Sequence, residues 1–377
     1  MVFHYLFVVF LLLMSGCTSN QSSLPSPFQN HFQPDGTYHV GLNPNFLVTA
    51  DLNQDGIPDL ITSNTNSNNI SVLLGNKDGS FKDHVMFPVG KRPRGIAVGD
   101  FNGDHIPDIA VTNNETDDVT ILLGNGDGTF REGDTIKLDQ RSPLFVTAGD
   151  FNQDGKIDLL MLSRFDHLIL YLGNGDGTFT FSKTFNADDT PTALVVGDFN
   201  RDHIPDLAVT NNGPMKSGLE IFIGDGKGNF DPGFKYEAKN YRPLALTMAD
   251  LNNDGKMDLI TVDPTHHNVT VFLGNGDGTF KVNEPISGDS EPISIVADDF
   301  NGDHLMDLAF VNYASNTLVV LYGNGDGTFK SPSARYQTKR NPFSMVKGNF
   351  HRRGIIDIAI ANHGDSSVTL FQAKEEK

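Results

Sequence analysis

The chain has 377 residues, of which 38% are hydrophobic, and its formal net charge is −19. This length and hydrophobic content allow a sizeable core, whereas the acidity argues against a nucleic-acid partner, which would require a basic surface. The chain has a single cysteine and therefore forms no intrachain disulfide.

The N-terminus has the pattern of an export signal. Residues 2–13 are almost wholly apolar, and Ser15 and Gly16 lead directly to Cys17. An apolar run that ends in small residues is typical of a signal peptide, and small residues followed at once by cysteine resemble the bacterial lipobox, in which that cysteine is lipidated. We therefore predict a lipoprotein-type signal over 1–17, lipidation of Cys17 and a polar tether over 18–33. The protein would then be exported to the cell envelope or surface and reach the membrane only through its lipid anchor.

Two features of this segment leave an alternative open. The first residues carry no Lys or Arg, and Met14 stands where the lipobox usually has Leu. A non-cleaved anchor or a misassigned start would give the same pattern, although the apolar run is short for a transmembrane helix.

After the signal, one unit repeats seven times. Its acidic nine-residue loop begins at Asp51, Asp100, Asp150, Asp198, Asp250, Asp299 and, in degraded form, Asn349. In the second unit, strands are expected over 95–99, 109–112, 119–123 and 135–138. A glycine-rich hairpin turn over 124–130 precedes the fourth strand. Four antiparallel strands in about 50 residues are typical of one blade of a β-propeller.

A proline at a fixed place in each unit supports a count of seven blades. Proline is tolerated just ahead of a strand but not in its middle, so it marks the start of each innermost strand. The seven prolines each lie seven residues before the loop: Pro44, Pro93, Pro143, Pro191, Pro243, Pro292 and Pro342. The predicted fold is therefore an all-β, seven-bladed propeller of four-stranded antiparallel blades.

The two ends of the repeat region predict how the ring closes. The last unit stops after its third strand, 367–371, whereas residues 34–38 resemble the hairpin turn of the other units. We expect the stretch near 38–40 to supply the missing outer strand of the last blade, which removes exposed sheet edges. The propeller is predicted over 34–372 and a charged tail over 373–377.

The acidic loops predict calcium sites. Side-chain oxygens at positions 1, 3, 5 and 9, with the backbone carbonyl of position 7, form a tight frame of oxygen ligands similar in logic to an EF-hand loop. Oxygen donors without Cys or His favour calcium over zinc. The predicted ligands of about six ions are Asp51, Asn53, Asp55, Ile57, Asp59; Asp100, Asn102, Asp104, Ile106, Asp108; Asp150, Asn152, Asp154, Lys156, Asp158; Asp198, Asn200, Asp202, Ile204, Asp206; Asp250, Asn252, Asp254, Lys256, Asp258; and Asp299, Asn301, Asp303, Leu305, Asp307.

Alternative interpretations of these loops remain open. Asp, Asn and Gly favour turns in any case, but turn formation does not require the acid found at position 9 of all six loops. Position 6, which is Gly or His, is expected to have a left-handed backbone. In the seventh loop Arg353 replaces the central carboxylate, and we expect it to pair with Asp357 in place of an ion. The aspartates of the hairpin turns are expected to bond their own backbone.

The units resemble the FG-GAP or VCBS-type repeats of bacterial surface proteins and the seven-bladed propeller of integrin α subunits. The resemblance rests on the Asp-x-Asn-x-Asp-Gly-x-x-Asp loops and on Leu-Gly-Asn-Gly-Asp-Gly-Thr-Phe near residues 121–130, and it covers about residues 35–371. It implies a calcium-binding lower face and a ligand-binding upper face. The upper face would be built from the loops that carry the prolines and from the polar loops after each second strand.

The predicted upper face carries a basic cluster on an acidic protein. Its ligand candidates are Arg92, Arg94, Arg141, Arg242 and Arg340. We predict a calcium-stabilised, surface-anchored and monomeric platform for adhesion or interaction, with a protein or an anionic glycan as ligand and no enzymatic activity. The alternative is a propeller that binds or degrades polysaccharide. No nucleophile motif supports catalysis, and the absence of Trp weakens a lectin interpretation.

Overall fold

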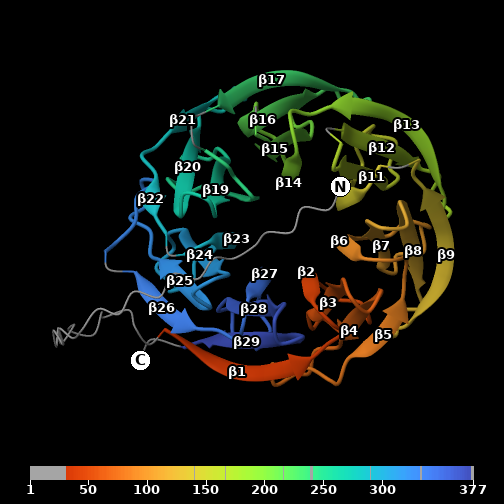
Figure 1. The fold of residues 1–377 in the computed structure, drawn as a ribbon, viewed down its shortest axis with the longest axis horizontal. Coiled ribbons are helices and arrows are strands. Elements are labelled where there is room, and N and C mark those ends of the chain that lie inside the picture. The colour runs from red at the N-terminus through yellow and green to blue at the C-terminus, as the bar shows by residue number, and fades with distance from the viewer. Residues whose placement is uncertain are drawn as a thin grey trace, which may run out of the picture.

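The computed structural model describes residues 31–139, 141–165, 167–214, 216–237, 241–288, 290–331 and 333–374. The predicted signal, Cys17 and nearly all of the predicted tether lie outside these residues. The described chain forms seven antiparallel sheets arranged in a ring around a central axis (Figure 1). The predicted all-β, seven-bladed propeller is therefore confirmed.

The innermost strand of each blade runs along the central axis. Six of the seven begin at the predicted proline, and the strand of the fifth blade begins two residues after Pro243. These strands are β2 (Pro44–Ala50), β6 (Pro93–Gly99), β10 (Pro143–Gly149), β14 (Pro191–Gly197), β18 (Ala245–Ala249), β23 (Pro292–Asp298) and β27 (Pro342–Gly348).

The second strand of each blade is the most deeply buried. Each begins at position 9 of the preceding loop, so this aspartate is the first residue of an almost wholly buried strand. Both faces of the strand are covered because the neighbouring blades pack against it, which explains its continuous apolar sequence. These strands are β3 (Asp59–Asn64), β7 (Asp108–Asn113), β11 (Asp158–Ser163), β15 (Asp206–Asn212), β19 (Asp258–Asp263), β24 (Asp307–Asn312) and β28 (Asp357–Asn362).

The third and fourth strands complete each blade toward the rim of the ring. The third strands are β4 (Asn69–Leu73), β8 (Asp118–Gly124), β12 (His167–Gly173), β16 (Ser217–Gly224), β20 (Asn268–Gly274), β25 (Thr317–Leu321) and β29 (Ser367–Ala373). The outer strands are β5 (Val85–Pro88), β9 (Phe130–Lys137), β13 (Phe179–Asn186), β17 (Phe230–Glu237), the broken pair β21 (Phe280–Val282) and β22 (Ile286–Ser287), β26 (Ala334–Gln337) and β1 (Phe32–His39).

The N-terminal strand β1 closes the ring by pairing with β29, so the last blade has the order β1-β29-β28-β27. The closure was predicted, but its register was not. Residues 34–38 lie inside the strand, with an irregularity between Pro34 and Gly36, and do not form a turn. Phe32 starts the strand as Phe130 starts β9, so the chain joins the propeller slightly earlier than predicted. At the other end, Ala373 belongs to β29 and not to a tail.

The hydrophobic core is divided into clusters that lie between adjacent blades. An aromatic side chain at position 2 of an acidic loop packs against the phenylalanine that starts the next blade's outer strand. The ring centroids of Phe101 and Phe179 are 5.4 Å apart, and those of Phe300 and Phe32 are 5.9 Å apart. Such edge-to-face pairs add about 0.5–1.5 kcal/mol beyond burial, and the Phe32 pair shows that β1 reproduces the contact at the point of closure. The described residues include no helix with the length and hydropathy needed to cross a membrane.

Candidate calcium loops and binding face

The acidic loops join the innermost strand to the second strand at one end of the ring, which we call the lower face. The opposite end, the upper face, carries the loops that precede the innermost strands and those that join second to third strands. Position 6 has a left-handed backbone, as predicted: φ is 77° at Gly56 and 65° at His105. Position 4 is also left-handed, at Gln54 for example, which the sequence pattern did not indicate because this position is variable.

The side chains at positions 1, 3 and 5 hold each loop closed through hydrogen bonds to backbone N–H groups. In the first loop, the Asp55 N–H donates to Asp51 Oδ1 at 3.0 Å, and the Gly56 N–H donates to Asp51 Oδ2 at 2.9 Å. The Asp55 N–H also donates to Asn53 Oδ1, and the Ile57 N–H donates to Asp55 Oδ1. The remaining five acidic loops repeat the bonds to positions 1, 3 and 5.

The aspartate at position 9 links the loop to the rest of its blade. Asp59 Oδ2 accepts from the Leu52 N–H and Asp59 Oδ1 accepts from the Gly75 N–H, both at 2.8 Å. One carboxylate therefore fixes the start of the loop and the end of the third strand. The same two bonds occur in all six acidic loops, and every one of these aspartates is fully buried: Asp59, Asp108, Asp158, Asp206, Asp258 and Asp307.

Burial makes these carboxylates weaker acids than an exposed aspartate. Desolvation raises the pKa of Asp59 and of Asp258 to about 6, and that of Asp307 to about 7. The two backbone N–H donors oppose the shift, whereas the charges of the carboxylates at positions 5 and 1 add to it. Burial raises the pKa of the other three in the same way. Each loop thus concentrates negative charge around a buried carboxylate, which a bound cation would relieve.

The oxygen ligands that the loops offer fit calcium, although their side chains do not surround a common metal position. No three His, Cys, Asp or Glu side chains of the described residues form a group that could hold a metal ion. The chemistry nevertheless suits a hard cation, because each loop offers three carboxylates and an amide oxygen. Each position-9 oxygen uses one lone pair for its N–H donor and keeps another. In two loops a lysine ammonium already reaches the position-5 carboxylate: Lys256 contacts Asp254 and Lys330 contacts Asp303, both at 3.0 Å.

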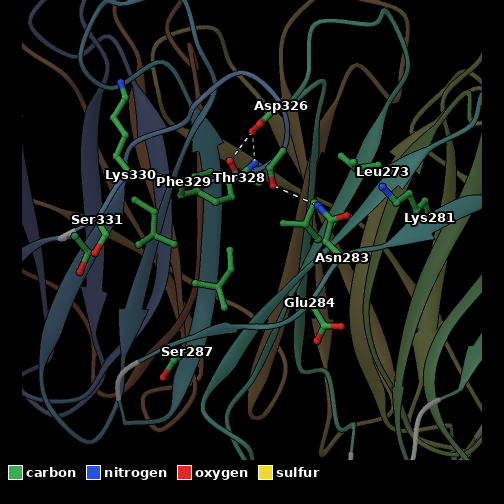
Figure 2. Close-up of a pocket in the computed structure, with 15 residues that line it drawn as sticks. Leu273, Lys281, Asn283, Glu284, Ser287, Asp326, Thr328, Phe329, Lys330 and Ser331 are labelled. Carbon is green, nitrogen blue, oxygen red and sulfur yellow. Dashed lines mark hydrogen bonds between the residues drawn. The ribbon is translucent and has the colours of Figure 1, made fainter.

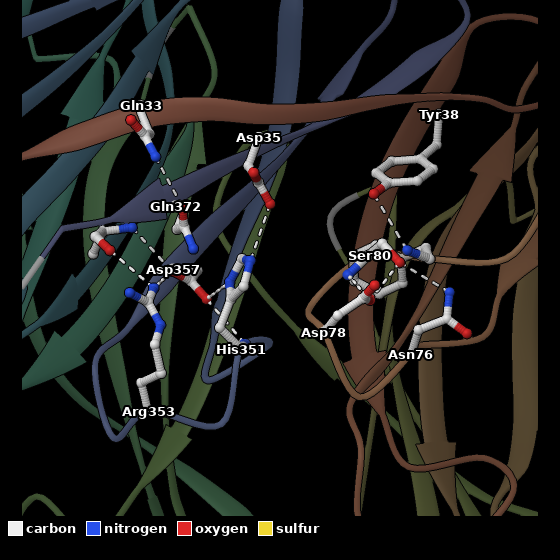
Figure 3. Close-up of polar contacts among 12 residues, drawn as sticks. Gln33, Asp35, Tyr38, Asn76, Asp78, Ser80, His351, Arg353, Asp357 and Gln372 are labelled. Atoms are coloured by element: carbon white, nitrogen blue, oxygen red, sulfur yellow. Dashed lines mark hydrogen bonds and ion pairs between the residues drawn. The ribbon is translucent and has the colours of Figure 1, made fainter.

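In the seventh loop, a histidine and an arginine side chain contact the buried aspartate. His351 Nδ1 lies 2.7 Å from Asp357 Oδ2, and His351 Nε2 lies 3.0 Å from Asp35 Oδ2 in β1 (Figure 3). Arg353 lies 3.5 Å from Asp357 Oδ1, as predicted, and donates to the Ala373 carbonyl at 2.9 Å. The sequence analysis identified the arginine and missed the histidine, whose position 3 in the loop was the available signal.

The aspartates of the hairpin turns bond their own turns, as predicted. Asp127 Oδ1 accepts from the Thr129 N–H at 2.9 Å and from its hydroxyl. These bonds lower the pKa of Asp127. The same bonds are made by Asp78, Asp176, Asp277 and Asp326.

At the upper face, all seven blades line a hollow of about 240 Å³ at the end of the central axis. The residue that follows each strand-marking proline lies there, so a ring of seven side chains forms its wall. Six of the seven are uncharged, and Arg94 is the charged one. The lining is Asn45, Phe46, Arg94, Leu144, Phe145, Thr192, Ala193, Leu244, Ala245, Ile293, Ser294, Phe343 and Ser344. We call this hollow the central mouth.

The predicted ligand-face arginines do not form one cluster. Arg94 lines the central mouth, and Arg92 and Arg164 are close enough for their charges to lower its pKa, after the larger effect of burial. Arg141 donates to Thr184 Oγ1 on the outer strand β13, away from the axis. Arg340 pairs with Asp365 at 2.7 Å.

Arg242 is half-buried, and its backbone N–H donates to Asp263. Arg164, in the loop after β11, was not among the candidates. Its place in the polar loop after the second strand was the signal that could have found it.

A family model described as FG-GAP-like repeat matches residues 51–111, 106–161, 150–209, 204–261 and 250–310. The chain belongs to the FG-GAP-like repeat family. Each match begins within or at the start of an acidic loop, so the loops and the buried strands after them carry the family pattern. No curated protein matches the chain.

Solved structures confirm the fold of this FG-GAP propeller. BBS1N, from a crystal structure of its complex with ARL6DN, has a TM-score of 0.66 at 11% identity over 91% of this chain and 97% of that chain. A protein from Lactobacillus plantarum has a TM-score of 0.63 at 15% identity over 82% and 89%. Raptor from Chaetomium thermophilum has a TM-score of 0.63 at 10% identity over 92% of this chain and 29% of its own.

The FG-GAP propeller also has a groove of about 540 Å³ between its fifth and sixth blades (Figure 2). It opens where the fifth blade's outer strand breaks into β21 and β22. Asn283 bridges the blades by donating to the Gly327 carbonyl at 3.4 Å. Lys281 and Glu284 contribute opposite charges to the walls.

Proposed function

We propose that this chain is an exported, surface-anchored propeller that calcium stabilises and that binds a protein partner on its upper face. The observation that carries this proposal is the central mouth. The innermost strands of all seven blades begin around it, and its half-buried apolar side chains, such as Leu144 and Phe343, are open to a ligand. An apolar hollow within a polar surface is typical of an interaction site.

The lining of the mouth favours binding over catalysis. It contains no Asp, Glu, His or Cys, and its single charged group is Arg94. A general base or nucleophile would require at least one of these groups, or an activated hydroxyl with a base beside it. The solved propellers of the same fold include BBS1N, whose structure is of a complex with ARL6DN, which supports a protein as the partner.

Calcium would act on the opposite face as a stabiliser. The predicted ligands at positions 1, 3, 5, 7 and 9 of six loops would hold it, and its charge would offset that of the buried position-9 carboxylate. At extracellular-module affinities of ~10⁻⁴ M and about millimolar calcium, each ion would add roughly 1.4 kcal/mol. The lipobox-like sequence at Cys17 supports the anchor.

Affinity capture from an envelope extract tests the proposed function. The full chain, Leu144→Asp in the mouth and the control Phe181→Asp would be used with calcium and with chelator. Phe181 is 52% exposed on the outer strand β13, so its variant perturbs a different surface. A protein captured by the wild type and the control but not by Leu144→Asp supports the proposal. Capture of polysaccharide alone, or equal capture by both variants, contradicts it.

A further inference from the structure

We infer that the central mouth binds an acidic segment of its partner protein, with Arg94 holding a carboxylate while a neighbouring apolar side chain enters the hollow. The inference rests on the proposed function and specifies the chemistry of the partner. Arg94 is its central residue, and Arg92 and Arg164 supply additional positive charge at the rim.

The backbone around Arg94 is held by the first blade and by the second strand of its own blade. Its carbonyl accepts from the Ser63 hydroxyl of the first blade at 2.6 Å, and the next N–H, that of Gly95, donates to Thr112 Oγ1 at 2.9 Å. A Cβ at Gly95 would lie 2.8 Å from the Phe145 Cα, so the second and third blades approach closely at this point. The backbone therefore needs no ordering when Arg94 binds an anion, and the half-buried side chain has fewer rotamers to lose than an exposed arginine.

Among the described residues, the guanidinium groups near the mouth form no ion pair with a carboxylate. No ion pair joins Arg92, Arg94 or Arg164 to a carboxylate in the part of the chain that the structure describes, and Arg94 Nε is buried without a hydrogen-bond partner. The charge of Arg94 also lowers the pKa of His363, after the larger effect of burial, in the seventh blade. The charge of Arg94 is therefore felt from the second blade to the seventh. With no ion pair among the described residues, these three guanidinium groups form a local positive field on a protein of net charge −19, and such a field favours an anion.

The apolar wall and the size of the mouth indicate what accompanies the carboxylate. Phe46 and Phe145 pack edge to face with ring centroids 5.4 Å apart beside Arg94. The volume of about 240 Å³ is below the ~300–1,000 Å³ of small-molecule pockets and suits one or two side chains of a polypeptide. Phe165, 55% exposed next to Arg164, is a further exposed apolar side chain in the loop after β11. An acidic residue beside an aromatic or aliphatic one matches both features.

A selection from a library of displayed random peptides on the immobilised full chain tests the inference. Arg94→Gln keeps much of the side chain and removes the charge, and Arg164→Ala removes a rim charge. Arg141→Ala and Arg340→Ala are matched controls, because their guanidinium groups are held by Thr184 and Asp365. Thermal melting of each variant confirms that it is folded. Binding of alginate and polygalacturonate is measured in parallel.

The wild type and the two controls should enrich peptides with Asp or Glu next to an apolar residue. Arg94→Gln should reduce their affinity at least tenfold, and Arg164→Ala by less. Enrichment of peptides without acids, equal affinity for Arg94→Gln, or Arg94-dependent binding of the polyuronates alone would overturn the inference. A partner that Leu144→Asp loses and Arg94→Gln retains would overturn this inference while leaving the proposed function intact.

Discussion

The six acidic loops and the seventh loop share one backbone conformation, but different charged groups surround their buried aspartate. In the six, the position-9 carboxylate is surrounded by two further carboxylates, and burial raises its pKa. In the seventh, His351 lies 2.7 Å from Asp357 and Arg353 lies 3.5 Å from it. The chain places Arg353 beside the buried aspartate once, and we propose that calcium supplies the positive charge in the other six loops.

The seventh loop also differs in its location, because it lies where the ring closes. His351 contacts both Asp357 of its own loop and Asp35 of β1. The two ring nitrogens face these two carboxylates, so one side chain joins the first strand of the propeller to the last blade. A calcium ion bound within the loop would not provide the ring nitrogen with which His351 contacts Asp35 of β1.

Deleting residues 31–42 should have the largest effect. It removes β1 and exposes the edge of β29. It also removes Asp35, one of the two carboxylates that His351 contacts. We expect the cooperative thermal transition followed by circular dichroism to disappear. Deletion of residues 1–29 is the matched control and should leave the transition in place. An unchanged melting temperature in the longer deletion would show that β1 does not close the ring.

Removing calcium should have the next largest effect. Six ions at about 1.4 kcal/mol each would exceed half of a typical stability margin if they act independently, which corresponds to a fall in melting temperature on the order of 10 °C. The test is scanning calorimetry with calcium and with chelator. Equal melting temperatures would mean that the loops are closed by hydrogen bonds alone.

Replacing His351 by alanine should destabilise the protein by about 3 kcal/mol, because it leaves the buried carboxylate of Asp357 without its nearest side-chain partner. Denaturant unfolding measures this change. His105→Ala is the matched control: His105 also lies near an acidic side chain but is 93% exposed, so its loss should have little effect. If the two variants unfold alike, His351 is not a substitute for an ion.

The stability of the protein should depend on pH through the buried carboxylates of the six acidic loops, which is a smaller effect. The folded pKa of about 6 for Asp59 and about 7 for Asp307 lies above the ordinary value of 3.8, so protonation favours the folded state. This contribution is fully present below about pH 4 and is lost as the pH rises through 6 to 7. The gain in melting temperature from calcium should therefore be larger at pH 7.5 than at pH 5. A gain that is equal at both values would contradict this account.

The sequence could predict the fold because the same signal occurs many times. The proline, the acidic loop and the glycine-rich turn each recur at a fixed place, and the structure confirms the strands that they delimit. The register of β1 could not be predicted, since Pro34 to Tyr38 resemble a turn by composition, and it is the pairing with β29 that makes them a strand. Local propensity was overridden by tertiary context.

Less of the two candidate sites could be predicted. The spacing of the loop residues identified the buried Asp at position 9, but not that its oxygens accept from the Leu52 and Gly75 N–H groups in the first loop. On the upper face, single arginines such as Arg94 and Arg340 look equivalent in sequence. Only the packing of the blades shows that Arg94 lines the mouth whereas Arg340 is paired with Asp365.

The most direct test of the difference between the loops is a count of bound calcium by native mass spectrometry. The wild type should bind six ions, and the variant Asn349→Asp/His351→Asn/Arg353→Asp, which restores the acidic pattern to the seventh loop, should bind a seventh. A wild-type count of zero, or of seven, would contradict the account.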